Sequence, residues 1–242
     1  NKAFEIDGNG DISFYNSAGT SQSLFWDASE ERLGLGTTSP SSALEVADSD
    51  VELRITDTRN SSFTAGDTVA SLGFYSNDTS GNSGGANNLP RGAIDIVTAN
   101  TFGSIHDMVF RTRGDQTTTA SEKMRIDSSG NLLVGTTSAT PQDGDHGFVA
   151  RATGYTISSV ANARVMLLNR AGDDGDILQL RKDNAVVGSI GVSNTRLHIG
   201  SGDAGLLIAG DLDNITPWNS TTGASRDAAV DLGNSGVRFK DL

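Results

Sequence analysis

The chain has 242 residues, enough for one or two domains, but its composition argues against a large compact core. Only 36% of the residues are hydrophobic and 6% are aromatic, while 29 are glycine, well above the roughly 7% of average proteins. The formal net charge of -12 disfavours nucleic acid as a partner, and the lack of cysteine excludes disulfides and thiolate chemistry. Because no apolar run approaches the ~18 residues that span a bilayer, no membrane insertion is expected.

Short turn units come first along the chain. Residues 6–12 and 126–132 share the order apolar, Asp, two small residues, Gly, amide or acid, apolar. This order predicts a tight hairpin, in which Asp accepts backbone N–H bonds and Gly supplies the positive φ. Residues 32–40 (Arg-Leu-Gly-Leu-Gly-Thr-Thr-Ser-Pro) end in the same way as 132–138, and further apolar-glycine units follow at 197–202 and 230–236.

Strands are predicted where apolar side chains fall on every second residue. The clearest case is Val-Glu-Leu-Arg-Ile-Thr at 51–56, and the same alternation occurs at 123–127, 177–181 and 196–199, with less regular versions at 93–97 and 108–111. The best helical candidate, 159–170, is interrupted by Asn162 and Asn169, so we interpret it as a strand.

The strands and turn units predict two small antiparallel β modules joined by strand-turn connectors. The expected divisions are a connector at 1–46, a first module at 47–127, a connector at 128–146, a second module at 147–209 and a final connector at 210–242. A short hairpin with one apolar face buries too little area to fold alone. Three chains wound about one axis would cover these faces, so the predicted fold is an elongated all-β homotrimeric fibre with intertwined connectors.

Three of these strings resemble a known family. Residues 32–40, 122–135 and 231–242 are similar to the connectors of bacteriophage tail fibre proteins, notably those of marine and cyanobacterial phages. The last string is similar to the segment that precedes an endosialidase-type intramolecular chaperone in such fibres, so we expect the chain to be part of a longer protein whose chaperone domain follows. The catalytic Ser-Asp motif of that chaperone does not occur in these 242 residues.

The resemblance implies a homotrimer located in the virion, in the extracellular tail fibre, with other phage tail proteins and a host-surface glycan or protein as partners. The expected function is host attachment by multivalent binding, without enzymatic activity, cofactor or metal. The predicted trimer core contains Leu33, Leu35, Leu132, Val134, Leu197, Ile199 and Trp218. The polar, Asn-rich stretch after Tyr75 is the predicted receptor-binding loop, with candidates Tyr75, Asn77, Asp78, Asn82, Asn87 and Asn88.

Other interpretations of the sequence stay open. The chain can be a purely structural shaft or collar, a bacterial surface adhesin or a polysaccharide-degrading spike. Acidic turns at 143–145 and 172–176 are spaced like parts of a calcium loop, but they lack the remaining ligands and the final Glu, which favours ordinary turns. His106 next to Asp107 and near Ser104 is a weak hydrolytic candidate, because no Gly-x-Ser-x-Gly turn accompanies it. Trp26 and Trp218 are expected at subunit junctions.

Overall fold

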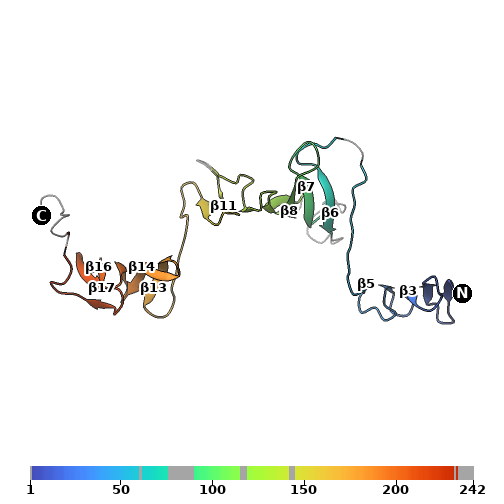
Figure 1. The fold of residues 1–242 in the computed structure, drawn as a ribbon, viewed down its shortest axis with the longest axis horizontal. Coiled ribbons are helices and arrows are strands. Elements are labelled where there is room, and N and C mark those ends of the chain that lie inside the picture. Colours follow the sequence, from blue (N-terminus) through green and yellow to red (C-terminus); the bar gives the residue numbers. More distant parts are fainter. Residues whose placement is uncertain are drawn as a thin grey trace, which may run out of the picture. The chain divides into compact units, whose positions relative to one another are not determined.

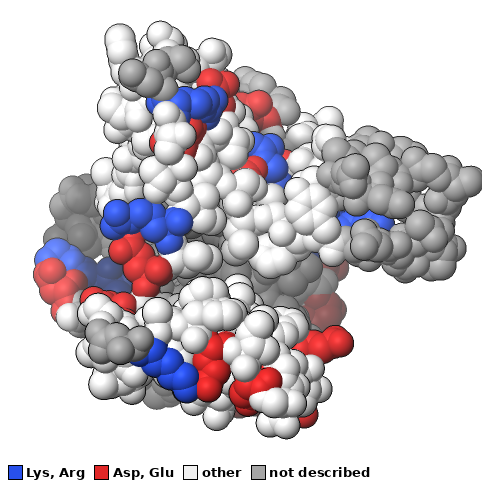
Figure 2. Space-filling model, turned by 90° about the vertical axis from the view of Figure 1, so that its right-hand side faces the viewer, with Lys and Arg blue, Asp and Glu red and all other residues white. Residues whose placement is uncertain are grey.

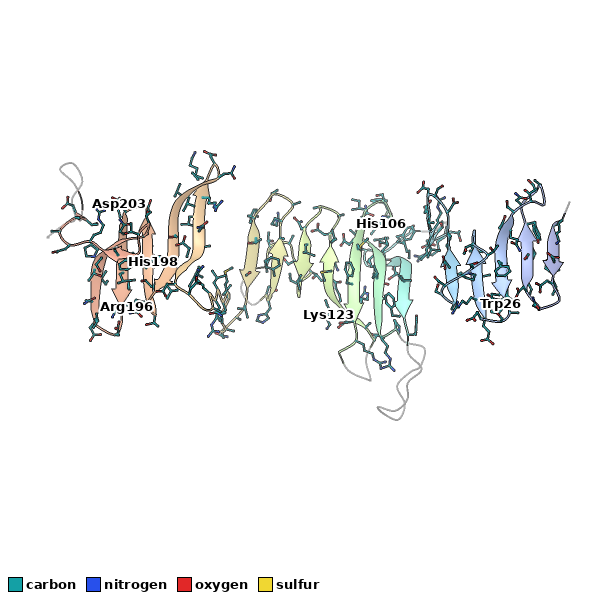
Figure 3. The ribbon with its side chains drawn as sticks, turned by 90° about the horizontal axis from the view of Figure 1, so that it is seen from below. Trp26, His106, Lys123, Arg196, His198 and Asp203 are labelled. Atoms are coloured by element: carbon teal, nitrogen blue, oxygen red, sulfur yellow. The ribbon has the colours of Figure 1, made fainter. Side chains whose placement is uncertain are left out.

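The computed structural model describes residues 2–59, 62–75, 90–114, 119–141, 145–231 and 233. These residues form strands and turns and no helix, which confirms the predicted all-β class. The strands belong to three sheets, in which their order in space follows their order along the chain (Figures 1 and 3). None of the described residues builds a helix long and apolar enough to span a membrane. The homotrimeric fibre remains a prediction.

The chain divides into two compact units, residues 1–130 and 131–242. Sheet 1 lies in the first unit and contains β1 (Phe4–Ile6), β2 (Ile12–Tyr15), β3 (Gln22–Asp27), β4 (Arg32–Leu35) and β5 (Leu44–Val46). Its first four strands are antiparallel, whereas β5 runs parallel to β4.

Sheet 2 begins in the first unit with β6 (Thr68–Phe74), β7 (Gly92–Thr98), β8 (His106–Thr112) and β9 (Ser121–Ile126). Its strands in the second unit are β10 (Leu132–Val134), β11 (Gly147–Ala150) and β12 (Thr156–Ser159). Sheet 3 contains β13 (Gly175–Lys182), β14 (Ala185–Ser193), β15 (Arg196–Ser201), β16 (Ala204–Ala209), β17 (Asn214–Asn219) and β18 (Ala224–Ser225).

The predicted turn units form the expected hydrogen bonds. Asp7 Oδ1 accepts from the backbone N–H groups of Asn9 (2.8 Å) and Asp11 (3.0 Å), and Gly10 has a φ of +90°. Asp127 Oδ1 likewise accepts from Ser129 N at 2.9 Å, and Gly130 has a φ of +80°. The Asp side chain therefore replaces backbone partners within the turn, and glycine allows the chain to reverse.

The two Gly-Thr-Thr-Ser strings also share one local structure. Gly36 and Gly135 have φ values of +77° and +70°. The N–H of Ser39 donates to Thr37 Oγ1 at 3.2 Å, and the corresponding bond from Ser138 to Thr136 Oγ1 measures 3.1 Å. In the first copy a Cβ on Gly36 would lie 2.0 Å from the carbonyl oxygen of Ala47, so glycine is required there by both conformation and space.

The predicted strands at 93–97, 108–111, 123–127, 177–181 and 196–199 correspond to β7, β8, β9, β13 and β15. Two predictions were wrong. Residues 51–56 are not a strand, because no described backbone segment of the chain pairs with them. The strand predicted at 159–170 is limited to Ser159, the end of β12, and the residues that follow run without a ladder partner up to β13.

Candidate functional site

Each sheet leaves one face uncovered by its own chain. Within each unit, the substantial contacts between described strands join members of the same sheet, so no second layer of strands covers either face. The buried apolar residues among those described are few and mostly small: Phe25, Ala93, Val97, Val109, Ala120, Leu133, Val149, Leu207, Ala209 and Trp218. Many more large apolar side chains are exposed. The candidate functional site is therefore the exposed apolar face of a sheet rather than a pocket.

The apolar face of sheet 1 is continuous across all five strands. The strand register aligns one row of side chains at Phe4, Phe14, Leu24, Leu35 and Val46. The neighbouring row consists of Ile6, Ile12, Trp26, Leu33 and Leu44. All ten are exposed or half-buried, and the rings of Phe4 and Phe14 lie 5.0 Å apart between centroids. Burying a fully exposed side chain of this size stabilises by about 1.5–3 kcal/mol, so covering this face would contribute several kcal/mol.

The opposite face of sheet 1 is mostly polar, with the ring of Phe25 buried in it. Ser13 and Phe25 are buried there, next to Gly34. Tyr15 donates its hydroxyl to Glu5 Oε2 at 2.7 Å, and Gln22 Nε2 donates to Ser13 Oγ at 2.8 Å. Hydrogen bonds from Lys2 and then from Tyr15 lower the pKa of Glu5. The sheet thus satisfies its polar side internally and leaves its apolar side open.

The first four strands of sheet 2 also have one apolar face and one polar face. Its apolar face has one row at Leu72, Ile94, Phe110 and Met124 and a second at Ala70, Ile96, Met108 and Ile126. In the second unit, β10 and β11 place Val134 and Phe148 opposite each other on an exposed face, while Leu133 and Val149 are buried on the other.

Ion pairs occupy the opposite face of β7, β8 and β9. The carboxylate of Asp95 is buried, and it accepts from Arg111 Nε and from Ser71 Oγ, both at 2.6 Å. The buried Asp107 accepts from Arg125 Nη1 at 2.6 Å and from the N–H of Ser128 at 2.8 Å. Glu122 binds Arg125 through two further bonds of 2.6 and 2.7 Å. This hydrogen bonding raises the pKa of Arg125, and the nearby charges of Glu122 and Asp107 add to the effect.

Sheet 3 has the most extensive uncovered surface in the second unit. Its apolar rows are Leu178, Ile190, Ile199, Leu206 and Pro217, and then Val192, Leu197, Ile208 and Ile215. Most of these are exposed, whereas the opposite face buries Ser189, His198, Leu207 and Trp218. The pattern is the same as in sheet 1, although the two sheets differ in sequence.

A buried polar group lies on the covered face of sheet 3. The rings of His198 (labelled in Figure 3) and Trp218 lie 6.2 Å apart between centroids. A Cβ on Gly191 would lie 2.6 Å from His198 Nε2, so glycine makes room for the imidazole against the sheet. Hydrogen bonds from Gln179 and then Ser189 lower the pKa of the neighbouring Asp176 carboxyl, and the charges of His198 and Arg170 act in the same direction.

The predicted core residues divide between the two faces. Leu33, Leu35, Leu132, Val134, Leu197 and Ile199 lie on uncovered apolar faces, as does Trp26. Trp218 lies on the covered face of sheet 3, inside its own chain. Trp218 had been expected at a subunit junction because of its size.

Of the residues predicted to bind a receptor, the structure describes Tyr75. Tyr75 follows β6 and is exposed. Asn77, Asp78, Asn82, Asn87 and Asn88 lie outside the described residues.

The residues considered as a hydrolytic site do not come together in the structure. His106 is exposed at the start of β8, whereas Asp107 is buried and bound to Arg125 and Ser128, and Ser104 Oγ accepts from Asn100 Nδ2 at 3.1 Å. These residues therefore form no hydrolytic relay.

The acidic turn at 172–176 is held by protein donors. Asp173 pairs with Arg170 at 2.8 Å, and Asp174 Oδ2 accepts from Asn194 N at 2.7 Å. Asp143 and Gly144 of the other acidic turn lie outside the described residues. Across the described part of the chain, no three His, Asp or Glu side chains gather as a metal site.

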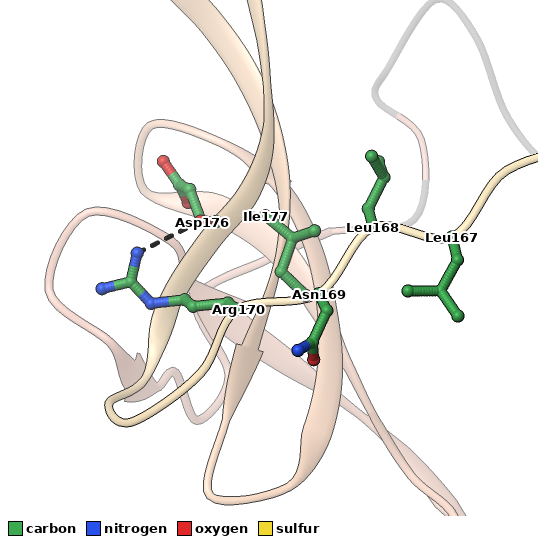
Figure 4. Close-up of a pocket in the computed structure, with 6 residues that line it drawn as sticks. All are labelled: Leu167, Leu168, Asn169, Arg170, Asp176 and Ile177. Carbon is green, nitrogen blue, oxygen red and sulfur yellow. Dashed lines mark hydrogen bonds between the residues drawn. The ribbon is translucent and has the colours of Figure 1, made fainter. Parts of the chain in front are cut away.

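One open hollow lies beside β13, lined by Leu167, Leu168, Asn169, Arg170, Asp176 and Ile177 (Figure 4). Leu167 and Leu168 point to opposite sides of the chain there, and Arg170 Nη1 donates to the carbonyl of Asp176 at 3.4 Å. The charged groups that line it have partners within the protein: Arg170 pairs with Asp173, and Asp176 accepts from Gln179 Nε2. On the side drawn in Figure 2, basic side chains lie beside acidic ones, so neither charge dominates there.

The fold and surface define an all-β protein whose sheets each have one buried face and leave an apolar face exposed. No known family model and no curated protein matches this chain.

Proposed function

We propose that the chain is a structural and adhesive subunit of a bacteriophage tail fibre, in which three copies surround a common axis. The observation that carries the proposal is the ten-residue apolar face of sheet 1, with its counterparts in sheets 2 and 3. A monomer would keep these faces in water at a cost of several kcal/mol for each sheet. Three one-sided sheets that turn their apolar faces toward one axis remove that cost.

The adhesive part of the proposal depends on avidity. Three identical weak sites on one rigid body raise the effective concentration of the second and third contact, so modest affinity per site becomes firm attachment. Tyr75 and the polar stretch that follows it, 76–88, are the proposed contact with a host glycan or protein.

The assembly is tested by measuring the mass of the full chain in solution by size-exclusion chromatography with light scattering. We expect a species three times the 25.1 kDa mass of the chain. A stable monomer at micromolar concentration would remove the basis of the proposal.

The adhesive role is tested separately by binding the assembled protein to bacterial cells and to isolated envelope glycans. Deletion of 77–88 should abolish binding and leave the number of chains in the assembly unchanged. An assembled protein that binds neither cells nor glycans would instead be a shaft or collar. Release of new reducing ends from a polysaccharide would assign it to the degrading spikes.

A further inference from the structure

Residues 51–56 have the side-chain pattern of a strand without a partner in their own chain. Val51, Leu53 and Ile55 are 52%, 79% and 52% exposed. Glu52 and Arg54 alternate with them in the sequence and form an ion pair of 3.3 Å. Figure 1 shows an extended trace between β5 and β6 that includes these residues. An isolated extended segment gains nothing from such alternation, because neither side is covered.

The backbone groups of this segment are also unused. Within the described residues, the last backbone hydrogen bond before the segment runs from Ala47 N to Leu35 O, and the first one after it from Asp67 N to Thr64 O. Six successive residues with alternating apolar side chains therefore offer unpaired donors and acceptors. This combination is the template on which another strand adds.

We propose that residues 51–56 form a β-strand by pairing with a second copy of this chain. The inference rests on the proposed function, because the apolar faces of the sheets on both sides of the segment would be covered by the same copies. The segment directly follows β5, the edge strand of sheet 1, and leads to β6, the edge strand of sheet 2. Its Val51, Leu53 and Ile55 side chains would continue those apolar faces.

Charge complementarity supports a second copy as the partner. The segment carries one acidic and one basic side chain, Glu52 and Arg54, so two copies bring no net charge together. A stagger of two residues between parallel copies places Glu52 of one opposite Arg54 of the next. Because the side-chain period of a strand is two, this stagger keeps Val51, Leu53 and Ile55 on one side. Opposite charges at facing positions stabilise a strand pair, whereas like charges would destabilise it.

Hydrogen-exchange mass spectrometry of the full chain tests the pairing. In the assembled protein, the amides of 51–56 should exchange at least about tenfold more slowly than in an unstructured peptide, and dilution to monomers should remove this protection. The amides of β7, which are paired within the chain, should stay protected in both conditions.

The possible results separate this inference from the proposed function. An assembled protein with unprotected 51–56 would overturn the strand pairing and leave the assembly intact. A monomer at every concentration, with 51–56 unprotected, would overturn both. Protection that survives in the monomer would mean that the segment pairs inside its own chain, and that too would overturn the inference.

A matched pair of variants tests the side-chain alternation. Leu53→Asp places a carboxylate on the apolar side and should lower the protection of 51–56 at least about tenfold in the assembled state. Thr56→Asp adds the same charge on the polar side and should leave the protection unchanged. Equal effects of the two variants, or no effect of Leu53→Asp, would refute a strand with one covered side.

Discussion

Replacing Ile199 by aspartate distinguishes an uncovered surface from a buried interface. Ile199 is 46% exposed in the single chain. Full burial of an isoleucine side chain stabilises by about 1.5–3 kcal/mol, so in a monomer, where only half of that is realised, Ile199→Asp should cost about 1 kcal/mol. In a trimer the same change buries three carboxylates close together, and each carries a desolvation penalty of several kcal/mol.

The trimer should therefore lose more than about 10 kcal/mol, a change of about seven orders of magnitude in its dissociation constant. Sedimentation equilibrium of the wild-type chain and the variant measures this directly: the variant should be monomeric where the wild type is assembled. Thr222→Asp is the control, because Thr222 is an exposed turn residue after β17 and gains the same charge. If both variants assemble like the wild type, sheet 3 does not bury this face in the assembly.

Four further predictions concern stability, each measured by chemical or thermal unfolding. Gly36→Ala should destabilise by about 2 kcal/mol or more, because the new Cβ would lie 2.0 Å from a carbonyl oxygen at a φ of +77°. Asp95→Asn should cost about 2–4 kcal/mol, because it leaves a partly buried guanidinium without its carboxylate. Thr195→Gly should stabilise by up to about 1 kcal/mol, because Asn194 and Thr195 form a two-residue hairpin turn with φ of +47° and +68°, where glycine is preferred. The pKa of Asp176 is lowered in the folded chain, so its contribution to stability is present above the usual carboxyl pKa of about 4 and should be lost as the pH falls below it.

Each of these predictions has a control variant. Gly8→Ala should be nearly neutral, because nothing lies within 4 Å of the added Cβ in the same sheet. Asp183→Asn removes an exposed ion pair with Lys182 and should cost less than about 1 kcal/mol. Asp176→Asn should remove the part of the stability loss at acid pH that comes from this carboxyl group. Thr195→Ala should not reproduce the gain of the glycine variant, because alanine does not favour a positive φ.

The sequence was informative where a strand and its partner lie close together in the chain. The alternation at 123–127 and 196–199 was sufficient, because each of these strands pairs with the strand that precedes it in the chain. At 51–56 the same alternation predicted a strand that the single chain does not form. Periodicity reports which side chains share a face, and it carries no information on the partner that supplies the hydrogen bonds.

The candidate surface could be predicted in part for the same reason. Leu197 and Ile199 were recognised from alternation, and Leu33 and Leu35 from the repeated apolar-glycine units; all four lie on the uncovered faces. Trp218 was chosen for its size, and it lies on the covered side of its sheet. The ion pairs of Asp95 and Asp107 were not predicted, because they join residues 16 and 18 positions apart in three different strands.

The meander order of the strands has a consequence for how the protein reaches its final state. Within each sheet, strands that are neighbours in space are also neighbours in sequence, so the sheets need no long-range chain closure and can form quickly. In the proposed trimer, the encounter of separate chains would then be the slow step. Refolding should be fast and independent of dilution for the backbone signal, while recovery of the complete particle should slow as the protein is diluted.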